Sequence, residues 1–274
     1  MYRSEPHVHR SVDPSSPSRP ERSHTDVYLR VLSALMLRDM RSRFGGTFWG
    51  YLVQVLWPCV HLGIIVGAMQ FRGMRSPMGG DTMIFAATGA LPALAFRYVS
   101  REVMKGYQIH KPLTYFPQVK AFDTVVARAL VEIVSSFMGL VLICTVLLCF
   151  SSDPVPEDMV TAITSYLASI ALGLGVGWVN VGIVSVFPGW NIGYIGVSIL
   201  LYLTSGDYFL ACYMPDQIYY YMKWNPITDL IEWIRLGYDP ELPVQIEYTY
   251  VFGWVFGSLT IGLLMERFIA RAQK

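Results

Sequence analysis

Two long stretches without a charged side chain constrain this sequence most. Arg43 and Arg72 are separated by 28 residues that include no Lys, Arg, Asp or Glu, and Asp158 and Asp207 by 48 such residues. About 20 apolar residues in a helix cross the hydrocarbon core of a bilayer. The first stretch therefore holds one crossing and the second has room for two. Soluble domains do not need uncharged stretches of this length, so the sequence predicts an all-α membrane protein.

The charged residues that remain divide the chain into three parts. Only 15% of the 274 residues are charged, whereas soluble domains carry about 25%. Residues 1–26 are rich in Pro, Ser, Arg and His, a composition typical of a disordered tail. Residues 27–43 are predicted to form an amphipathic interface helix, and residues 44–274 a six-span transmembrane domain.

Six apolar segments within 44–274 are long enough to be predicted as membrane spans. Phe187, Pro188 and Gly189 interrupt the 48-residue stretch, because Pro and Gly favour a turn over a continuing helix. The second segment, residues 81–96, has the shortest uncharged core of the six. The predicted spans cover residues 50–71, 81–96, 125–150, 159–187, 191–209 and 248–265.

The basic residues predict which ends of the spans face the cytoplasm. Of the 21 Lys and Arg residues, seventeen lie before residue 44, in the 97–128 link or after residue 265. Loops on the cytoplasmic side carry an excess of Lys and Arg. Both termini and the 97–128 link are therefore predicted to be cytoplasmic. The 207–247 segment, with seven acidic residues, is predicted to lie outside.

The 27–43 segment has apolar residues at helical spacing and arginines elsewhere on the helix. Such a helix lies in the membrane interface with its apolar face in lipid. One interpretation is a simple lipid anchor. The other is that Arg38, Arg41 and Arg43 also bind an anionic lipid headgroup or glycan, since the planar guanidinium binds phosphate oxygens in pairs. The apolar face consists of Tyr28, Val31, Leu32, Leu35, Met36 and Met40.

The 97–128 link is too long for a simple turn and alternates charged with aromatic residues. Its first part is predicted to form a short helix parallel to the membrane. Two interpretations stay open: a docking surface for a cytosolic protein, or a solvated loop that obeys the positive-inside rule. The residues assigned to docking are Arg101, Glu102, Lys105 and Tyr107.

The 207–247 segment holds an unusual density of Tyr and Trp, and two short re-entrant helices are predicted there. Asn225 can cap the second helix and Pro226 suits its first position. Its apolar residues recur at helical spacing, and Asp229, Glu232 and Arg235 are predicted to lie away from that stripe. The aromatics form either an interfacial belt or a collar for sugar rings. The predicted gate residues are Tyr208, Tyr213, Tyr220, Trp224, Asn225, Pro226 and Trp233.

Few ionisable residues lie inside the predicted spans. Arg128 and Glu132 are four residues apart near the cytoplasmic end of a span, and a structural ion pair or snorkelling to the interface is favoured over a functional site. His61 is predicted to form a hydrogen bond between helices. No catalytic residue or metal site is predicted. The sequence contains no Gly-Lys dipeptide and hence no G-x-x-x-x-G-K-[ST] phosphate loop. Active transport would therefore use ATP hydrolysed by another chain.

Three segments of the sequence carry recognisable motifs. They are residues 37–51, followed by Trp57, Pro58 and His61, residues 119–128, and residues 224–235. These segments resemble, in turn, the motif that leads into the first span, the segment that opens the third span and the outer gate helix of a known family. That family is the type-2 ABC exporter permeases, and more narrowly the inner-membrane permeases of bacterial capsular polysaccharide export. Residues 207–215 depart from the Phe-Phe-Pro-like motif that often ends its fifth span.

This resemblance implies a function and a set of partners. It implies a homodimer in the bacterial inner membrane with two cytosolic ATPase subunits that bind ATP and Mg²⁺, and no cofactor in this chain. It also implies a lipid-linked polysaccharide substrate, a periplasmic co-polymerase or adaptor, an outer-membrane channel and no nucleic acid. By position, Arg38, Arg41 and Arg43 fall in the interface helix, 101–107 near the coupling helix and 224–235 in the gate helices.

Other functions stay open from the sequence. The same architecture could export O-antigen, teichoic acid or a drug, and the dense outer aromatics favour sugar over drug. An intramembrane glycosyltransferase would need a carboxylate pair or metal ligands at the membrane face. Asp229 and Glu232 resemble such a pair, but their predicted location outside, away from nucleotide-sugars, argues against this class. A passive scaffold is the third possibility.

Overall fold

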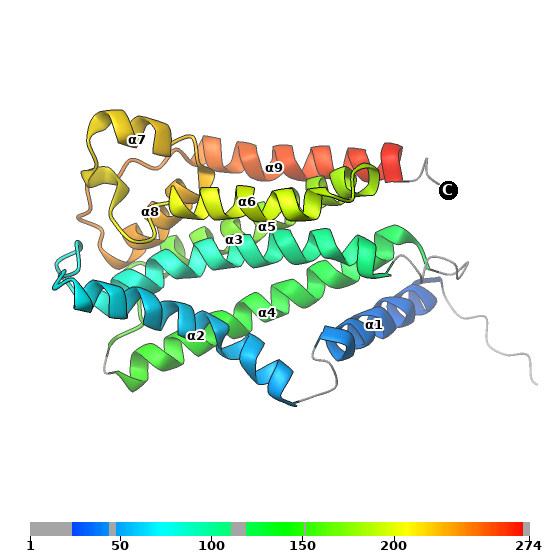
Figure 1. Ribbon diagram of the computed structural model, residues 1–274, viewed down its shortest axis with the longest axis horizontal. Coiled ribbons are helices and arrows are strands. Elements are labelled where there is room, and N and C mark those ends of the chain that lie inside the picture. Colours follow the sequence, from blue (N-terminus) through cyan, green and yellow to red (C-terminus); the bar gives the residue numbers. More distant parts are fainter. Residues whose placement is uncertain (1–23, 44–47, 111–118, 151, 271–274) are drawn as a thin grey trace, which may run out of the picture.

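The computed structural model describes residues 24–43, 48–110, 119–150 and 152–270, and all regular elements in these ranges are helical (Figure 1). The long helices run side by side along the long axis of the molecule. The α-helices are α1 (His24–Arg43), α2 (Phe48–Phe71), α3 (Thr82–His110), α4 (Ala121–Cys149), α5 (Met159–Val186), α6 (Trp190–Leu203), α7 (Asp216–Met222), α8 (Pro226–Tyr238) and α9 (Tyr248–Met265). A 3-10 turn, η2 (Ala211–Tyr213), precedes α7, and a π-helical turn, η3 (Glu266–Ala270), follows α9.

Four of these helices are long and apolar enough to cross a membrane. They are Thr82–Ile109, Phe122–Cys149, Met159–Val186 and Tyr248–Phe268. Two shorter apolar helices, Leu56–Phe71 and Trp190–Leu203, lie beside them. The prediction of an all-helical chain with several membrane-crossing helices is thus confirmed for the described residues. The count of six spans stays a prediction.

Helices α3 and α5 form the centre of the bundle, and glycines allow them to approach closely. A methyl group at Gly173 would lie 2.9 Å from Cβ of Val99, and one at Gly177 would lie 2.8 Å from Cβ of Val103. Small residues at this four-residue spacing permit close packing between helices in membranes. The Gly173–Gly177 pattern therefore builds the core of this chain.

The other side of α5 packs against α8 and α9, again through glycines. A methyl group at Gly262 of α9 would lie 2.8 Å from the backbone nitrogen of Val179, and one at Gly237 of α8 would lie 2.8 Å from that of Ala162. Because α5 contacts helices on several sides, about two thirds of its most apolar 18-residue stretch is buried inside the chain.

Local signals in the sequence explain where several helices begin and end. The Asp158 carboxylate accepts hydrogen bonds from the backbone N–H groups of Val160 and Thr161, at 3.0 and 3.2 Å, and so caps α5. Helix α5 ends at Val186 and α6 begins at Trp190. The predicted break at residues 187–189 is therefore confirmed.

The predicted boundary near Phe96 is wrong. Helix α3 continues through the predicted end of the second span to His110, so residues 101–107 belong to a long helix and not to a separate short helix. The physical reason is packing: Val99, Ser100, Val103 and Met104 are buried, two of them against the glycines of α5. Residues of α3 beyond the apolar segment that ends near Phe96 thus remain buried against α5, so the helix continues.

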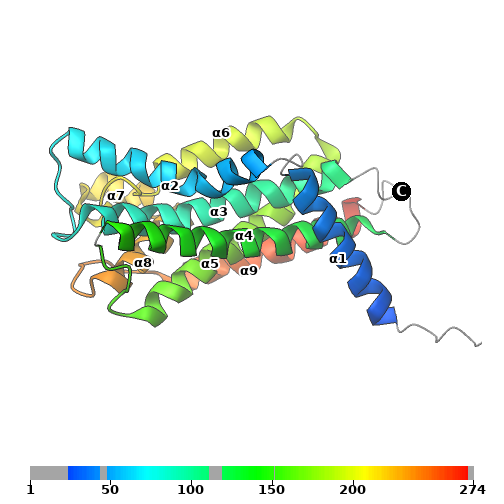
Figure 2. The same ribbon diagram turned by 90° about the horizontal axis from the view of Figure 1, so that it is seen from below.

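The two ends of the bundle carry different elements. Helices α7 and α8 lie at one end, and the C-terminal end of α9 and helix α1 lie at the other (Figure 1). Helix α1 is set at a steep angle to the remaining helices (Figure 2). The arginines predicted to bind a headgroup or glycan, here called the loading arginines (Arg38, Arg41 and Arg43), and the predicted coupling residues of 101–107 therefore share one end, here called the inner end. The predicted gate residues share the other, the outer end.

Candidate functional site

Helix α1 presents two of its three predicted loading arginines to the surroundings. Arg38 and Arg41 are exposed, while the side chain of Arg43 lies outside the described residues. The apolar Leu29 and Leu37 are also exposed, at 59% and 64%. An amphipathic helix with exposed leucines and arginines suits the boundary between lipid and water. Of the predicted tail, residues 1–23 lie outside the described part of the chain.

The predicted coupling residues occupy the last turns of α3. Arg101, Glu102, Lys105 and Tyr107 are all partly buried. The Nζ of Lys105 donates a hydrogen bond of 2.6 Å to Oε1 of Glu102. Tyr107 packs against the main hydrophobic core. These side chains are therefore partly packed into the bundle and partly exposed at its inner end.

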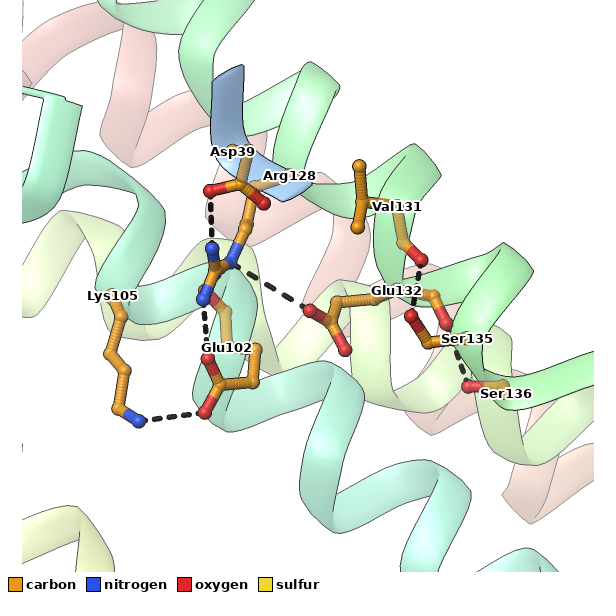
Figure 3. Close-up of polar contacts among 8 residues, drawn as sticks. All are labelled: Asp39, Glu102, Lys105, Arg128, Val131, Glu132, Ser135 and Ser136. Carbon is orange, nitrogen blue, oxygen red and sulfur yellow. Dashed lines mark hydrogen bonds and ion pairs between the residues drawn. The ribbon is translucent and has the colours of Figure 1, made fainter. Parts of the chain in front are cut away.

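Arg128 of α4 joins three helices at the inner end (Figure 3). Its side chain is 2% exposed. Nη1 donates to Oδ1 of Asp39 on α1, and Nη2 donates to Oε2 of Glu102 on α3. Nε also donates to the backbone oxygen of Glu102, at 3.3 Å. A guanidinium with two separate carboxylate partners is a strong, charge-assisted junction.

This junction differs from the ion pair predicted within α4. Glu132 lies 3.7 Å from Nε of Arg128, so the predicted pair is present, but the hydrogen-bonded carboxylates come from α1 and α3. Asp39 was not predicted as a functional residue. A signal was available, because Asp39 follows Leu35 by four residues and therefore lies on the same apolar face of α1. Both residues are buried.

At the outer end, the residues after α6 form the two short helices that the sequence predicts, α7 and α8. The side chain of Asn225 accepts a hydrogen bond of 3.1 Å from the backbone N–H of Ile227, and Pro226 is the first residue of α8. Both local predictions are confirmed. The apolar stripe of α8, Ile227, Leu230, Ile231 and Ile234, is buried within the chain.

The charged residues of α8, predicted only to lie away from the apolar stripe, are buried. Asp229, Glu232 and Arg235 are at most 2% exposed. Helix α8 packs against α3, α5 and α9 at once, so its polar side has neighbours too. A pattern of alternating apolar and charged residues predicts a half-exposed helix, and only the tertiary arrangement shows that this one is enclosed.

Arg235 bonds to the turn that follows α6. Its Nη1 donates to the backbone oxygens of Gly206 and Phe209, at 2.8 and 3.0 Å, and its Nη2 to that of Asp207, at 3.0 Å. The guanidinium carbon lies 4.2 Å from the ring centre of Phe85 on α3. Arg235 thus fixes α8, the turn and α3 to one another.

A second set of polar contacts connects the turn after α6 to α2. The Tyr202 hydroxyl donates to Oδ2 of Asp207, and Nε2 of His61 is within hydrogen-bonding distance of the same hydroxyl. His61 lies on α2 and Tyr202 on α6. The predicted hydrogen bond of His61 between helices is therefore confirmed, and its partner is now identified.

Two carboxyl groups of α8 are buried without full hydrogen bonding. Burial, with Glu232 nearby, raises the pKa of Asp229 to about 7, and burial also raises the pKa of Glu232. The Tyr219 hydroxyl lies 3.3 Å from Oε2 of Glu232. In the described part of the chain, no group of three His, Cys, Asp or Glu side chains could hold a metal ion.

The predicted aromatic collar divides into two sets. Tyr213, Tyr220 and Trp224 are exposed, at 60%, 61% and 66%. Trp233 is buried, and its ring centre lies 4.9 Å from that of Tyr248. Tyr208 is half-buried against Tyr202. Only the exposed set is free to meet a ligand, while Trp233 and Tyr208 hold the outer end together.

Comparison with known proteins relates the chain to capsule exporters. No family model matches it. The polysialic acid transport protein KpsM of Escherichia coli is 27% identical over 256 residues, which make up 90% of this chain and 96% of that protein. The capsule polysaccharide export inner-membrane protein CtrC of Neisseria meningitidis is 24% identical over 212 residues, 77% of this chain and 80% of that protein.

A third relative has the same kind of name. The capsule polysaccharide export inner-membrane protein BexB of Haemophilus influenzae is 22% identical over 218 residues, 80% of this chain and 82% of that protein. The predicted resemblance to capsule-export permeases is thus confirmed. The similarity extends over most of the chain, so it includes both ends of the bundle.

Proposed function

We propose that this chain, a relative of the capsule polysaccharide export inner-membrane proteins, is the permease subunit of an ATP-driven exporter. Its substrate would be a lipid-linked capsular polysaccharide that crosses the bacterial inner membrane. The observation that carries the proposal is the similarity to KpsM over 90% of the chain. A relation of that length covers the whole transmembrane bundle and not one shared motif.

We place six spans in the membrane, formed by α2, α3, α4, α5, α6 and α9. The helical part of α2 has 24 residues, a length of roughly 36 Å, which exceeds the ~30 Å hydrocarbon core. The 14 residues of α6 reach only about 21 Å, so the turn after α6 would complete that crossing. The basic inner end, with both termini, would face the cytoplasm.

The chain would act as a homodimer with two cytosolic ATPase subunits. The lack of a phosphate-binding loop in the sequence supports a separate ATPase. Two glycine pairs support the homodimer: Gly63 with Gly67 on α2, and Gly253 with Gly257 on α9. A methyl group at any of the four would meet no atom of another helix within 4 Å in the described part of the chain. These open small-residue faces suit contact with a second copy.

Each end of the bundle would have its own task. At the inner end, Arg38, Arg41 and Arg43 would bind the anionic headgroup, and Arg101, Glu102, Lys105 and Tyr107 would receive the movement of the ATPase. At the outer end, Tyr213, Tyr220 and Trp224 would stack on sugar rings as the glycan leaves. Asn225 and Pro226 would set where the gate helix α8 begins. A periplasmic adaptor and an outer-membrane channel would then take over the polysaccharide.

A complementation experiment tests the proposal. An Escherichia coli strain without its own KpsM receives this chain together with the ATPase encoded beside it, and polysialic acid on the cell surface is measured. We expect surface polysialic acid only when both chains are present. As a control, the same pair with an ATPase that cannot hydrolyse ATP should leave the glycan inside the cell.

The same pair in proteoliposomes separates export from enzymatic activity. We expect a lipid-linked polysialic acid oligomer to stimulate ATP hydrolysis by the pair, and the purified chain alone to leave the oligomer chemically unchanged. Chemical conversion by the lone chain would identify a glycosyltransferase instead. An assembled pair with neither stimulation nor surface glycan would contradict the proposal.

A further inference from the structure

We propose that Arg128 is the positioning residue that holds the interface helix α1 against the end of α3, and that its bond with Asp39 sets the position of α1. That the position of α1 affects coupling to the ATPase rests on the proposed function. That Arg128 sets the position of α1 does not rest on it.

Helix α1 has few other attachments to the bundle. Among its described side chains, only Leu35 and Asp39 are buried, and α4 is the helix against which α1 mainly packs. Tyr28, Leu29 and Met40 are exposed, and Val31, Leu32 and Met36 are only partly buried. Among the described side chains of α1, Asp39 is thus the buried charged group, and we take its partner as the contact that fixes where α1 lies.

Arg128 can hold two helices at once because the guanidinium carries its donors in a fixed planar arrangement. Nη1 is used for Asp39 of α1 and Nη2 for Glu102 of α3, while the residue itself belongs to α4 (Figure 3). A Lys at this position would offer a single point charge and could not keep the same geometry to both carboxylates.

The approach of α3 to α4 fixes where the guanidinium is placed. A methyl group at Gly106 of α3 would lie 3.0 Å from both Cβ and Cγ of Arg128. The stem of the arginine thus runs directly over Gly106, one turn beyond Glu102. Movement of the end of α3 would shift the guanidinium, and with it Asp39.

The partners of Arg128 are suited to exchange. Glu102 is shared between Arg128 and Lys105, whose Nζ lies 2.6 Å from Oε1 of Glu102. A small rotation of α3 would let Glu102 turn toward Lys105 and leave Arg128 with Asp39 and the more distant Glu132. Buried ion pairs add little net stability because desolvation offsets the attraction. A role in placing helices accounts for this one better than a role in stability alone.

A distance measurement tests the placement in the full-length chain. The four free cysteines (Cys59, Cys144, Cys149 and Cys212) are replaced, and spin labels are attached at the exposed Ser33 of α1 and the exposed Leu148 at the far end of α4. The chain is placed in nanodiscs, diluted with unlabelled chain so that only distances within one chain are read. The distance distribution is recorded by pulsed electron paramagnetic resonance.

We expect Asp39→Asn to widen the distribution at least about twofold, because loss of a buried charged hydrogen bond weakens the contact tenfold or more. Asp39→Glu should restore a narrow distribution. The matched control is Asp26→Asn, which removes an exposed carboxylate from the same helix and should change nothing. A distribution in Asp39→Asn equal to that of the wild type would overturn the proposal.

The coupling is tested with the partner ATPase in proteoliposomes. We expect Asp39→Asn to reduce stimulation by a lipid-linked polysialic acid oligomer about tenfold, with ATP hydrolysis in the absence of the oligomer changed less than twofold. A merely structural role would lower both rates and the yield of complex together, and that result would overturn the coupling. If the wild-type pair shows no stimulation, the proposed function fails, and the distance measurement still decides the role of Arg128.

Discussion

Two buried arginines lie at opposite ends of this bundle and are held in different ways. Arg235 at the outer end donates to three backbone oxygens of one turn and stacks on Phe85. Arg128 at the inner end donates to the side chains of Asp39 and Glu102, which belong to two other helices. Each is at most 2% exposed.

The difference lies in what the partners can do. A backbone oxygen moves only if its segment changes conformation, so Arg235 and the 206–209 turn form a fixed unit. A carboxylate can rotate about its side-chain bonds and choose another cation, as Glu102 can with Lys105. We infer that the outer end is built for rigidity and the inner end for movement between helices.

The strongest test of this comparison removes each charge. Arg235→Met would leave three backbone oxygens without their donor and Asp207 without its nearby cation. Each buried acceptor left without its donor costs about 1–3 kcal/mol, so with three of them we expect little folded protein. Arg128→Met should cost only about 1–2 kcal/mol, because Asp39 can move out with α1 and Glu102 keeps Lys105. Thermal unfolding in detergent, followed by size-exclusion chromatography, gives both values.

Lysine variants sharpen the same test. Arg235→Lys retains the charge but cannot reach three oxygens at once, so its stability should lie between those of wild type and Arg235→Met. If Arg128→Met unfolded the chain as thoroughly as Arg235→Met, the inner arginine would be a second fixed unit, and the contrast between the two ends would be wrong.

A pair of glycines tests the comparison without changing a charge. A methyl group at Gly89 would lie 2.8 Å from the backbone oxygen of Asp207, which cannot yield, and 3.0 Å from Nη2 of Arg235. We expect Gly89→Ala to destabilise by about 2–3 kcal/mol. At Gly106 the nearest atoms, at 3.0 Å, are side-chain carbons of Arg128. Gly106→Ala should cost about 1 kcal/mol or less.

A third glycine provides the control. A methyl group at Gly196 of α6 would meet no atom of another described helix or turn within 4 Å, so Gly196→Ala should be neutral or stabilising by about 1 kcal/mol, through helix propensity. The three free energies of unfolding are compared under one set of conditions. Equal costs at Gly89 and Gly106 would show that the outer turn adapts as readily as the inner junction.

Features set by neighbouring residues could be predicted from the sequence. The uncharged stretches indicated membrane-crossing helices, Pro188 and Gly189 indicated the break between α5 and α6, and Asn225 with Pro226 indicated the start of α8. In each case the signal lies within a few residues of the feature, because capping groups and helix breakers act on the adjacent turn.

Features that depend on distant residues could not be predicted. Asp39 and Arg128 are 89 positions apart in the sequence, and nothing near either residue identifies the other. The burial of Asp229, Glu232 and Arg235 depends on three helices that enclose α8. The extension of α3 to His110 depends on glycines of α5. In all three cases tertiary packing overrides the local pattern.

The enclosed carboxylates also predict a pH dependence of the outer end. The pKa of Asp229 is about 7 in the folded chain against a model-peptide value of about 3.9. The folded state therefore holds a proton that the unfolded state has released, and this contribution to stability is lost as the pH rises through 7. We expect Asp229→Asn to gain stability relative to wild type by about 2–3 kcal/mol between pH 5 and pH 8.

Thermal unfolding at the two pH values measures this gain. Asp216→Asn is the matched control, since it removes an exposed carboxylate from the neighbouring helix α7. An equal pH response in wild type and Asp229→Asn would show that water or another group satisfies the Asp229 carboxylate in the membrane.

The smallest expected effect on stability belongs to the exposed aromatics of the outer end. Because the interior beneath them is fixed, Tyr220→Ala and Trp224→Ala should each change the free energy of unfolding by less than about 1 kcal/mol. If these rings stack on sugar, export of the polysaccharide should nevertheless fall severalfold with the complex assembled. Ile218→Ala, at an exposed apolar residue of the same segment, should leave export unchanged. Normal surface polysaccharide in all three variants would reject the collar and leave these rings a role in the membrane interface only.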